Sequence, residues 1–166
     1  MDLALLAEQI AELPLSTAIR TGMSWRWLFP TIESLHVVAI GTVFGSIFLL
    51  DLRLLGIGAR DAKASKYSAQ MLPLTWTAFA LSIVTGVLLF IANAPSYVFN
   101  LQFRLKLLLI LLAGVNMAVF QWGVYRRVSE WDERLPPPNA ARIAAFVSIT
   151  CWTGTVFLGR WIGFVR

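Results

Sequence analysis

The chain has 166 residues, of which 58% are hydrophobic and only 14% are charged, and its net charge is +5. Soluble domains average about 45–50% apolar and about 25% charged residues, so this composition excludes an ordinary soluble globular protein. The basic residues lie between long apolar runs and form no stripe with aromatic residues, so the positive charge does not predict a nucleic-acid partner. The expected surrounding is the lipid bilayer.

The N-terminal segment, residues 2–19, differs from the rest of the chain. Leucine and isoleucine recur at helical spacing between Leu3 and Leu13, and Pro14 interrupts the pattern. The segment is too short to cross a bilayer, so we expect an interfacial amphipathic helix. Acidic residues precede the first basic residue, Arg20, which argues against a signal peptide.

Four apolar windows are long enough to cross the hydrocarbon core of a bilayer, which takes roughly 20 helical residues. They lie at residues 30–50, 72–93, 104–125 and 141–162. In lipid each segment must satisfy its own backbone polar groups, and strand-type alternation is absent, so each window is expected to be a helix. The sequence therefore predicts an all-α integral membrane four-helix bundle with an N-terminal interfacial helix, forming a single transmembrane domain over residues 1–166.

Basic residues are unevenly distributed over the connections between these windows. The middle connection has none before Arg104, whereas the first and third connections hold Arg53, Arg60, Lys63 and Lys66, and Arg126, Arg127, Arg134 and Arg142. The positive-inside rule places the first and third connections in the cytoplasm. We therefore expect a multi-pass protein of the bacterial inner membrane with both termini periplasmic.

The first window contains the only histidine of the chain, His36, three residues after Glu33. Residues at this spacing lie on nearly the same helix face. His36 is expected roughly 9 Å of helix rise below the outer interface if the span begins at Pro30. Ionisable groups inside a membrane are costly and face the bundle interior, so this pair is the first candidate for a functional role.

The alternating direction of the helices places further cations at the level of His36. Arg104 and Lys106 begin the third span, and Arg160 ends the fourth. A histidine with nearby arginines meets the needs of haem b, because imidazole ligates the iron and cations bind the propionates. We therefore predict a haem site in which His36 is the metal ligand, and Glu33, Arg104 and Arg160 surround the cofactor.

The same residues allow two other interpretations. His36 could move protons at a site for an anionic quinol or substrate. Alternatively, Glu33 and His36 could form a buried pair that fixes helix register, with the arginines reaching the interface. Met71 and Met117 are soft enough to be second haem ligands but lie deeper than His36, so gap-filling is the simpler role for them.

Three other features concern packing. Gly41 and Gly45 form a Gly-x-x-x-Gly face opposite His36, which suits close helix contact within the bundle or between copies. Asp51 is interpreted as a helix stop that pairs with Arg53 or a loop base. Asn116 and Gln121, in the inner half of the third span, can hydrogen-bond across helices.

Four segments carry a resemblance to known proteins: Phe29-Pro30-x-x-Glu33-x-Leu35-His36, Asp51-Leu52-Arg53-Leu54-Leu55-Gly56, Phe103-Arg104-Leu105-Lys106 and Gly159-Arg160-Trp161-Ile162. Together they resemble an uncharacterised family, a domain of unknown function, of small bacterial four-helix inner-membrane proteins. The first segment alone is remotely similar to the copper-resistance D membrane proteins and to the J-type protoporphyrinogen oxidase. This remote resemblance implies a haem or copper connection at His36.

The favoured function is a small inner-membrane haem-binding or electron-transfer module, working with a membrane or periplasmic redox partner or as a homo-oligomer. One alternative is a non-haem accessory or scaffold protein that docks a partner. Another is a small transport or copper-handling component. The sequence has no nucleophile-plus-base pattern and predicts no particular enzymatic reaction.

Overall fold

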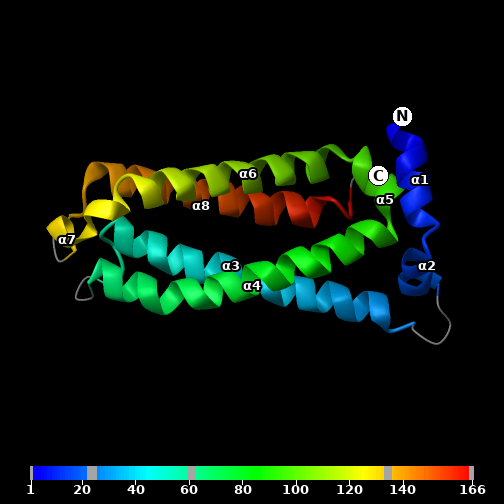
Figure 1. Cartoon of the computed structure of the whole chain (residues 1–166), viewed down its shortest axis with the longest axis horizontal. Coiled ribbons are helices and arrows are strands. Elements are labelled where there is room, and N and C mark those ends of the chain that lie inside the picture. The colour runs from blue at the N-terminus through cyan, green and yellow to red at the C-terminus, as the bar shows by residue number, and fades with distance from the viewer. Residues whose placement is uncertain (1, 22–25, 60–62, 133–135, 165–166) are drawn as a thin grey trace.

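The computed structural model describes residues 2–21, 26–59, 63–132 and 136–164, which form helices and no strands. Four long helices run back and forth along the molecule (Figure 1): α3 (Leu28–Leu54), α4 (Ala64–Ala92), α6 (Leu101–Trp122) and α8 (Asn139–Trp161). Each is long and apolar enough to cross a membrane. The predicted all-α membrane bundle is therefore confirmed.

The long helices coincide with the four predicted windows but extend beyond several of them. The largest extension is at the start of α4, which begins at Ala64, before the predicted position 72. The apolar window finds only the part of a helix that matches the hydrocarbon core, whereas the helix continues through polar residues outside it. Pro73 lies inside α4 without ending it, and the Thr77 hydroxyl donates to the Pro73 carbonyl at 3.0 Å.

The bundle consists of two closely packed helix pairs, α3 with α4 and α6 with α8 (Figure 1). The two pairs contact each other mainly through α3 and α8. Small side chains line the α3–α4 contact, where Ala39 and Ala78 are buried. The Thr75 hydroxyl donates to the Ser46 hydroxyl at 2.8 Å across this contact. In the other pair, the Asn116 side-chain amide donates to the Ala144 carbonyl at 2.9 Å, which confirms the predicted interhelical bond.

The Gly-x-x-x-Gly face does not make the close helix contact expected within the bundle. A Cβ atom added at Gly41 or Gly45 would meet no atom within 4 Å. The residues of α3 that are buried instead include Ile32, Ala39 and Val43, which lie on another side of the helix. The face of α3 that carries His36 therefore packs into the bundle, and the face that carries Gly41 and Gly45 does not.

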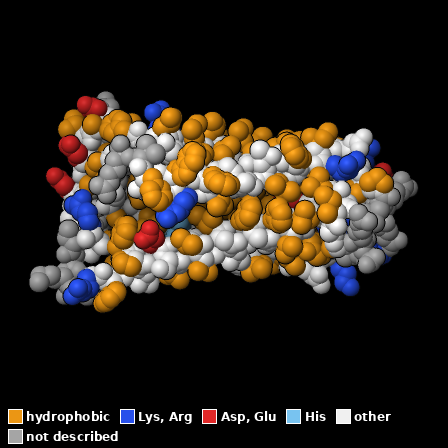
Figure 2. Space-filling view, turned by 180° about the vertical axis from the view of Figure 1, so that it is seen from behind, with side chains coloured by type: hydrophobic (Ala, Val, Ile, Leu, Met, Phe, Trp, Pro, Cys, Tyr) orange, Lys and Arg blue, Asp and Glu red, His pale blue; other side chains and the backbone are white. Residues whose placement is uncertain are grey.

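Large apolar side chains are exposed along the middle of the bundle, among them Val38 on α3, Val84 on α4, Leu111 on α6 and Phe146 on α8. Figure 2 shows hydrophobic side chains over this middle region, with most charged side chains toward the two ends. Such a surface is expected where lipid is the solvent. The chain is therefore a multi-pass membrane protein.

The end of the bundle that carries both chain termini is covered by short helices (Figure 1). Here α1 (Leu3–Ala11) packs against α5 (Ala94–Val98), and α2 (Pro14–Thr21) packs against α4. The single interfacial helix predicted over residues 2–19 is thus two helices, because Pro14 cannot continue the first but suits the first position of the second. The buried Ser16 hydroxyl donates to the Ile91 carbonyl at 3.0 Å and so satisfies an acceptor in the last turn of α4.

The opposite end, which carries η2 (Tyr125–Arg127) and α7 (Val128–Trp131), is held together by Asp132. Its carboxylate accepts from the Ser65 backbone N–H at 2.7 Å and from the Ser65 hydroxyl at 2.6 Å, and so caps α4. Its backbone carbonyl accepts from the Arg53 guanidinium at 3.2 Å. Burial works against the charged carboxylate, but the Ser65 hydrogen bonds and the charges of Lys63 and Arg53 hold the pKa of Asp132 below its ordinary value.

The predicted pairing of Asp51 with Arg53 is not what the structure shows. Arg53 is only 1% exposed and points its guanidinium at Asp132, whereas Asp51 lies near Ser148 of α8. The two side chains are two residues apart on α3, a spacing that does not place them side by side on a helix.

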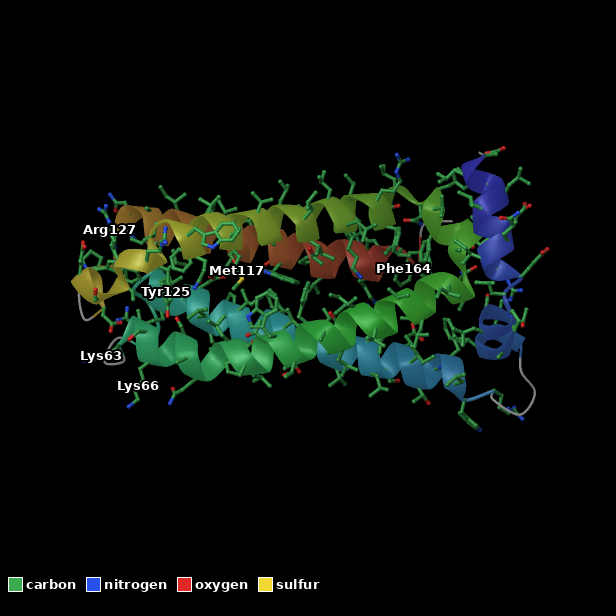
Figure 3. The ribbon with its side chains drawn as sticks, in the orientation of Figure 1. Lys63, Lys66, Met117, Tyr125, Arg127 and Phe164 are labelled. Atoms are coloured by element: carbon green, nitrogen blue, oxygen red, sulfur yellow. The ribbon has the colours of Figure 1, made fainter. Side chains whose placement is uncertain are left out.

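The cations of the first and third connections lie at this α7 end, where Figure 3 labels Lys63, Lys66 and Arg127, while Phe164 lies toward the other end. Arg60 and Arg134, which also entered the topology prediction, lie outside the described residues. The described cations therefore follow the uneven distribution that the sequence predicted.

Candidate functional site

The candidate site is built around His36, which lies in α3 in the half of the bundle nearer the termini and is half-buried. Its Nδ1 atom is 2.8 Å from the hydroxyl of Thr85 in α4. The Thr85 hydroxyl donates its own proton to the Leu81 carbonyl at 2.7 Å, so its oxygen accepts from the imidazole.

This arrangement selects one tautomer of the imidazole. With the proton on Nδ1 directed at α4, the Nε2 atom of neutral His36 carries a lone pair. A hydrogen bond at one ring nitrogen that orients the other is how proteins prepare histidine to ligate a metal or accept a proton. The local geometry thus leaves Nε2 as the ring nitrogen that can ligate a metal or accept a proton.

Gly86 allows the ring of His36 to lie against α4. A Cβ atom at this position would lie 3.0 Å from His36 Cε1, which is closer than most Cβ contacts, and 3.6 Å from Nδ1. A glycine inside a helix costs roughly 1 kcal/mol of stability relative to alanine. At Gly86 the absence of a side chain lets the imidazole ring approach the helix backbone closely, which accounts for a glycine at this position.

Lys106 is the cation whose charge acts on His36. It lies one turn into α6 and packs over α8, because a Cβ atom at Gly159 would meet Lys106 Nζ at 3.5 Å. Together with Thr85 of α4, these residues show that all four long helices contribute to this half of the bundle interior. The arrangement places a fixed imidazole near a lysine ammonium group within membrane-spanning helices.

Glu33 is not drawn into the interior with His36. It is exposed, and its charge acts on Tyr97 in α5. Burial, and then the negative charge of Glu33, raise the pKa of Tyr97. Tyr97 also stacks on Phe103, with ring centroids 5.4 Å apart, so Glu33 lies beside the aromatic cluster that joins α5 to α6. The expected Glu33–His36 pair does not appear among the hydrogen bonds of the described residues.

The two predicted propionate partners, Arg104 and Arg160, are exposed near the terminus-bearing ends of α6 and α8. The Arg160 guanidinium lies 4.8 Å from the centroid of the Phe164 ring, a cation–π contact. Exposure and this contact place the two arginines at the surface of the bundle. The cation that acts on His36 within the bundle is Lys106 instead.

Sequence reasoning did not single out Thr85 or Gly86. The available signal was Ser82-x-x-Thr85-Gly86, a set of small and polar residues at helical spacing inside an apolar span. Such residues mark helix–helix contacts in membranes. Their partner, however, depends on which helix lies opposite, and this information is not contained in the spacing.

No group of three or more His, Cys, Asp and Glu side chains that could hold a metal ion occurs among the described residues. Met117, considered as a second haem ligand, instead lines a cavity in the half of the bundle nearer α7, and Figure 3 shows it pointing into the interior. Side chains of the described part of the chain therefore provide His36 as a single candidate ligand in the terminus-bearing half.

Comparison with known proteins identifies a family that covers most of the chain. The sequence model of DUF6644, a family of unknown function, matches residues 20–165. No curated protein and no solved structure matches the chain. The match agrees with the uncharacterised family expected from the four sequence segments.

Proposed function

We propose that this chain, a member of the DUF6644 family, is a haem-binding electron-transfer module of the bacterial inner membrane. The function of the family is unknown, so the proposal rests on the chain's own residues. The observation that carries the proposal is the hydrogen bond between His36 Nδ1 and Thr85. It leaves Nε2 available, and this is the atom that a haem iron needs from a neutral histidine.

The residues around His36 fit haem b in chemistry. His36 would hold the iron, and Lys106 would bind a propionate, since an ammonium group pairs with a carboxylate by a charge-assisted hydrogen bond. Arg104 and Arg160 at the surface of the bundle would bind the second propionate, because their long side chains can reach between interface and interior. Glu33 would act at the entrance, beside Tyr97.

When bound, haem would supply one-electron transfer. The chain's own residues orient the imidazole through Thr85, keep its ring against α4 at Gly86 and set the local charge through Lys106. Axial ligand, hydrogen bonding and burial are the features by which a protein tunes haem potential. The described residues offer one axial ligand, so the second position would be open or filled by another copy.

The proposed orientation places the α7 end in the cytoplasm and both termini in the periplasm. Its support is the set of described cations at the α7 end: Arg53, Lys63, Lys66, Arg126, Arg127 and Arg142. Cytoplasmic connections of bacterial membrane proteins carry an excess of such residues. The haem site would then lie in the periplasmic half and exchange electrons with a periplasmic or membrane partner.

The decisive test is a reduced-minus-oxidised absorption spectrum of the detergent-purified protein from cells supplied with haem precursor. A near-stoichiometric b-type signal is expected, with its loss in His36→Ala and a lowered haem content in Lys106→Met. Lys66→Met, at an exposed lysine of the α7 end, is the matched control and should keep full haem content. A featureless spectrum of the unmodified protein would refute the haem proposal.

A further inference from the structure

A cavity of about 140 Å³ lies between the four long helices in the half of the bundle nearer α7. Its walls are mainly apolar and aromatic and include Trp76 and Phe79 of α4, Met117 of α6 and Trp152 of α8. Figure 3 shows Met117 and Tyr125 pointing into this region. The cavity is separate from the His36 site, whose residues are not among those that line it.

The cavity contains one acidic side chain, Asp51 of α3, which is only 5% exposed. Ser148 of α8 lines the cavity near it, and Asp51 Oδ2 has no hydrogen-bond partner among the described residues. A buried polar atom left without a hydrogen-bond partner destabilises the fold, and the effect is larger when the group is charged. Intramembrane carboxyl groups of this kind mark functional sites by default.

Two other polar side chains of the lining, Thr75 and Asn116, already have hydrogen-bond partners. The Thr75 hydroxyl donates to Ser46, and the Asn116 amide donates to the Ala144 carbonyl. The nearby Arg53 guanidinium is directed at the Asp132 carbonyl. Within the described lining, Asp51 therefore provides the one carboxylate, and its buried Oδ2 is an acceptor without a hydrogen-bond partner.

Volume and lining define the chemistry of the occupant. A cavity of roughly 150 Å³ lined by apolar side chains admits a benzene-sized molecule. Phe79 packs edge-on against both Trp76 and Trp152, with centroids 6.1 and 6.3 Å apart, so π faces and edges surround the space. Aromatic rings attract cations, and a buried carboxylate is stabilised by an opposite charge with a hydrogen-bond donor.

We infer that this cavity binds a small lipophilic ammonium compound, an aromatic or branched aliphatic primary amine in its protonated form. The ammonium group donates a hydrogen bond to Asp51 Oδ2, while the apolar part packs among the Trp76, Phe79 and Trp152 rings. A divalent metal cation suits this lining less well, since Asp51 is its one carboxylate and the other oxygen-bearing side chains are neutral. The binding site is independent of haem and lies in the opposite half of the bundle.

The test compares three probes of nearly equal shape, benzylammonium, benzyl alcohol and toluene, by calorimetric titration of the full-length protein in lipid nanodiscs. Benzylammonium should bind at least about tenfold more tightly than benzyl alcohol, as a buried charge pair with good hydrogen bonding implies, and toluene should bind most weakly. In Asp51→Asn the preference for benzylammonium should fall to within about twofold.

A second variant keeps the test informative if Asp51→Asn is poorly folded. Gly114 lines the cavity, and a Cβ atom there would meet no atom within 4 Å, so Gly114→Leu should occupy part of the space and weaken all three probes. Gly41→Leu adds the same side chain to the exposed face of α3 and should leave binding unchanged. Equal affinity of the three probes for the unmodified protein, or undiminished binding in Gly114→Leu, would overturn the inference.

Discussion

The Nδ1 atom of His36 in α3 and the hydroxyl of Thr85 in α4 are 2.8 Å apart, and the hydrogen bond between them determines which imidazole nitrogen is available. The bond joins the chain's only histidine to the helix that it packs against most closely. It serves both the packing of α3 on α4 and the chemistry of the candidate site. Replacing Thr85 therefore tests the two roles together.

Thr85→Val should lower haem affinity by about 10- to 100-fold, because loss of the hydrogen bond that orients a metal-ligating histidine has effects of this size. Haem titration of the purified apoprotein measures the change. Thr77→Val is the control, since the Thr77 hydroxyl is bonded to carbonyls of its own helix and the residue is exposed. An unchanged affinity in Thr85→Val would mean that the imidazole is not oriented by this bond.

Gly86→Ala should reduce haem content and shift the absorption maximum of any bound haem. The added methyl group would lie 3.0 Å from His36 Cε1 and push the ring away from α4. Gly41→Ala is the control, because replacing glycine by alanine in a helix favours folding by about 1 kcal/mol at either position. At Gly41 the added methyl group meets no atom within 4 Å. The two variants should therefore differ in spectrum, and thermal unfolding should show Gly41→Ala to be at least as stable as the parent.

Asp132→Ala should lower the free energy of unfolding by about 1 kcal/mol or more, as loss of a helix N-cap does. Asp132→Asn should cost less, because an amide can still accept from the Ser65 backbone N–H. Unfolding in detergent at neutral pH measures both. Glu130→Gln, an exposed change on the neighbouring short helix, should have little effect.

The same carboxylate predicts a pH dependence. The Ser65 hydrogen bonds and nearby cations keep the pKa of Asp132 in the folded protein below its unfolded value. Its contribution to stability is therefore complete above the ordinary aspartate pKa, about 4, and is lost as the pH falls further through the folded value. Unfolding curves between neutral and strongly acidic pH should show a smaller acid loss in Asp132→Asn than in the parent protein.

Ser46 and Thr75 should be coupled by a small energy. A double-mutant cycle with Ser46→Ala and Thr75→Val is expected to give about 0.6 kcal/mol, and at most about 1.7, as is typical of interhelical hydrogen bonds in membranes. A cycle of Ser46→Ala with Thr77→Val provides the comparison, because no hydrogen bond joins that pair in the structure. A coupling near zero in the first cycle would show that this bond adds nothing to the α3–α4 contact.

Much of the fold follows from the sequence because apolar length alone decides where a helix crosses a bilayer. The four windows predicted the four long helices, and Pro14 marked the break between α1 and α2 even though one helix was expected there. Helix ends were less predictable. The start of α4 depends on a cap from Asp132, which lies 67 residues after Ser65 in the chain.

The candidate site was predicted only in part. His36 was identified because an ionisable residue inside an apolar span has few explanations other than function. Its neighbours were assigned by level in the membrane, which suggested Arg104 and Arg160 and gave no reason to prefer Lys106. Level fixes position along the helix axis, but rotation about that axis decides which side chain faces inward.

The sequence by itself determined the class of protein, the number of apolar helices and the position of His36 along its helix, because these depend on one-dimensional features: apolar length and helix rise. The tertiary structure decided which faces meet. It turned Gly41 and Gly45 outward, placed Thr85 and Lys106 at the imidazole and left the Asp51 carboxyl in a cavity. Helix rotation and pairing result from the packing of four surfaces at once, and no single segment encodes them.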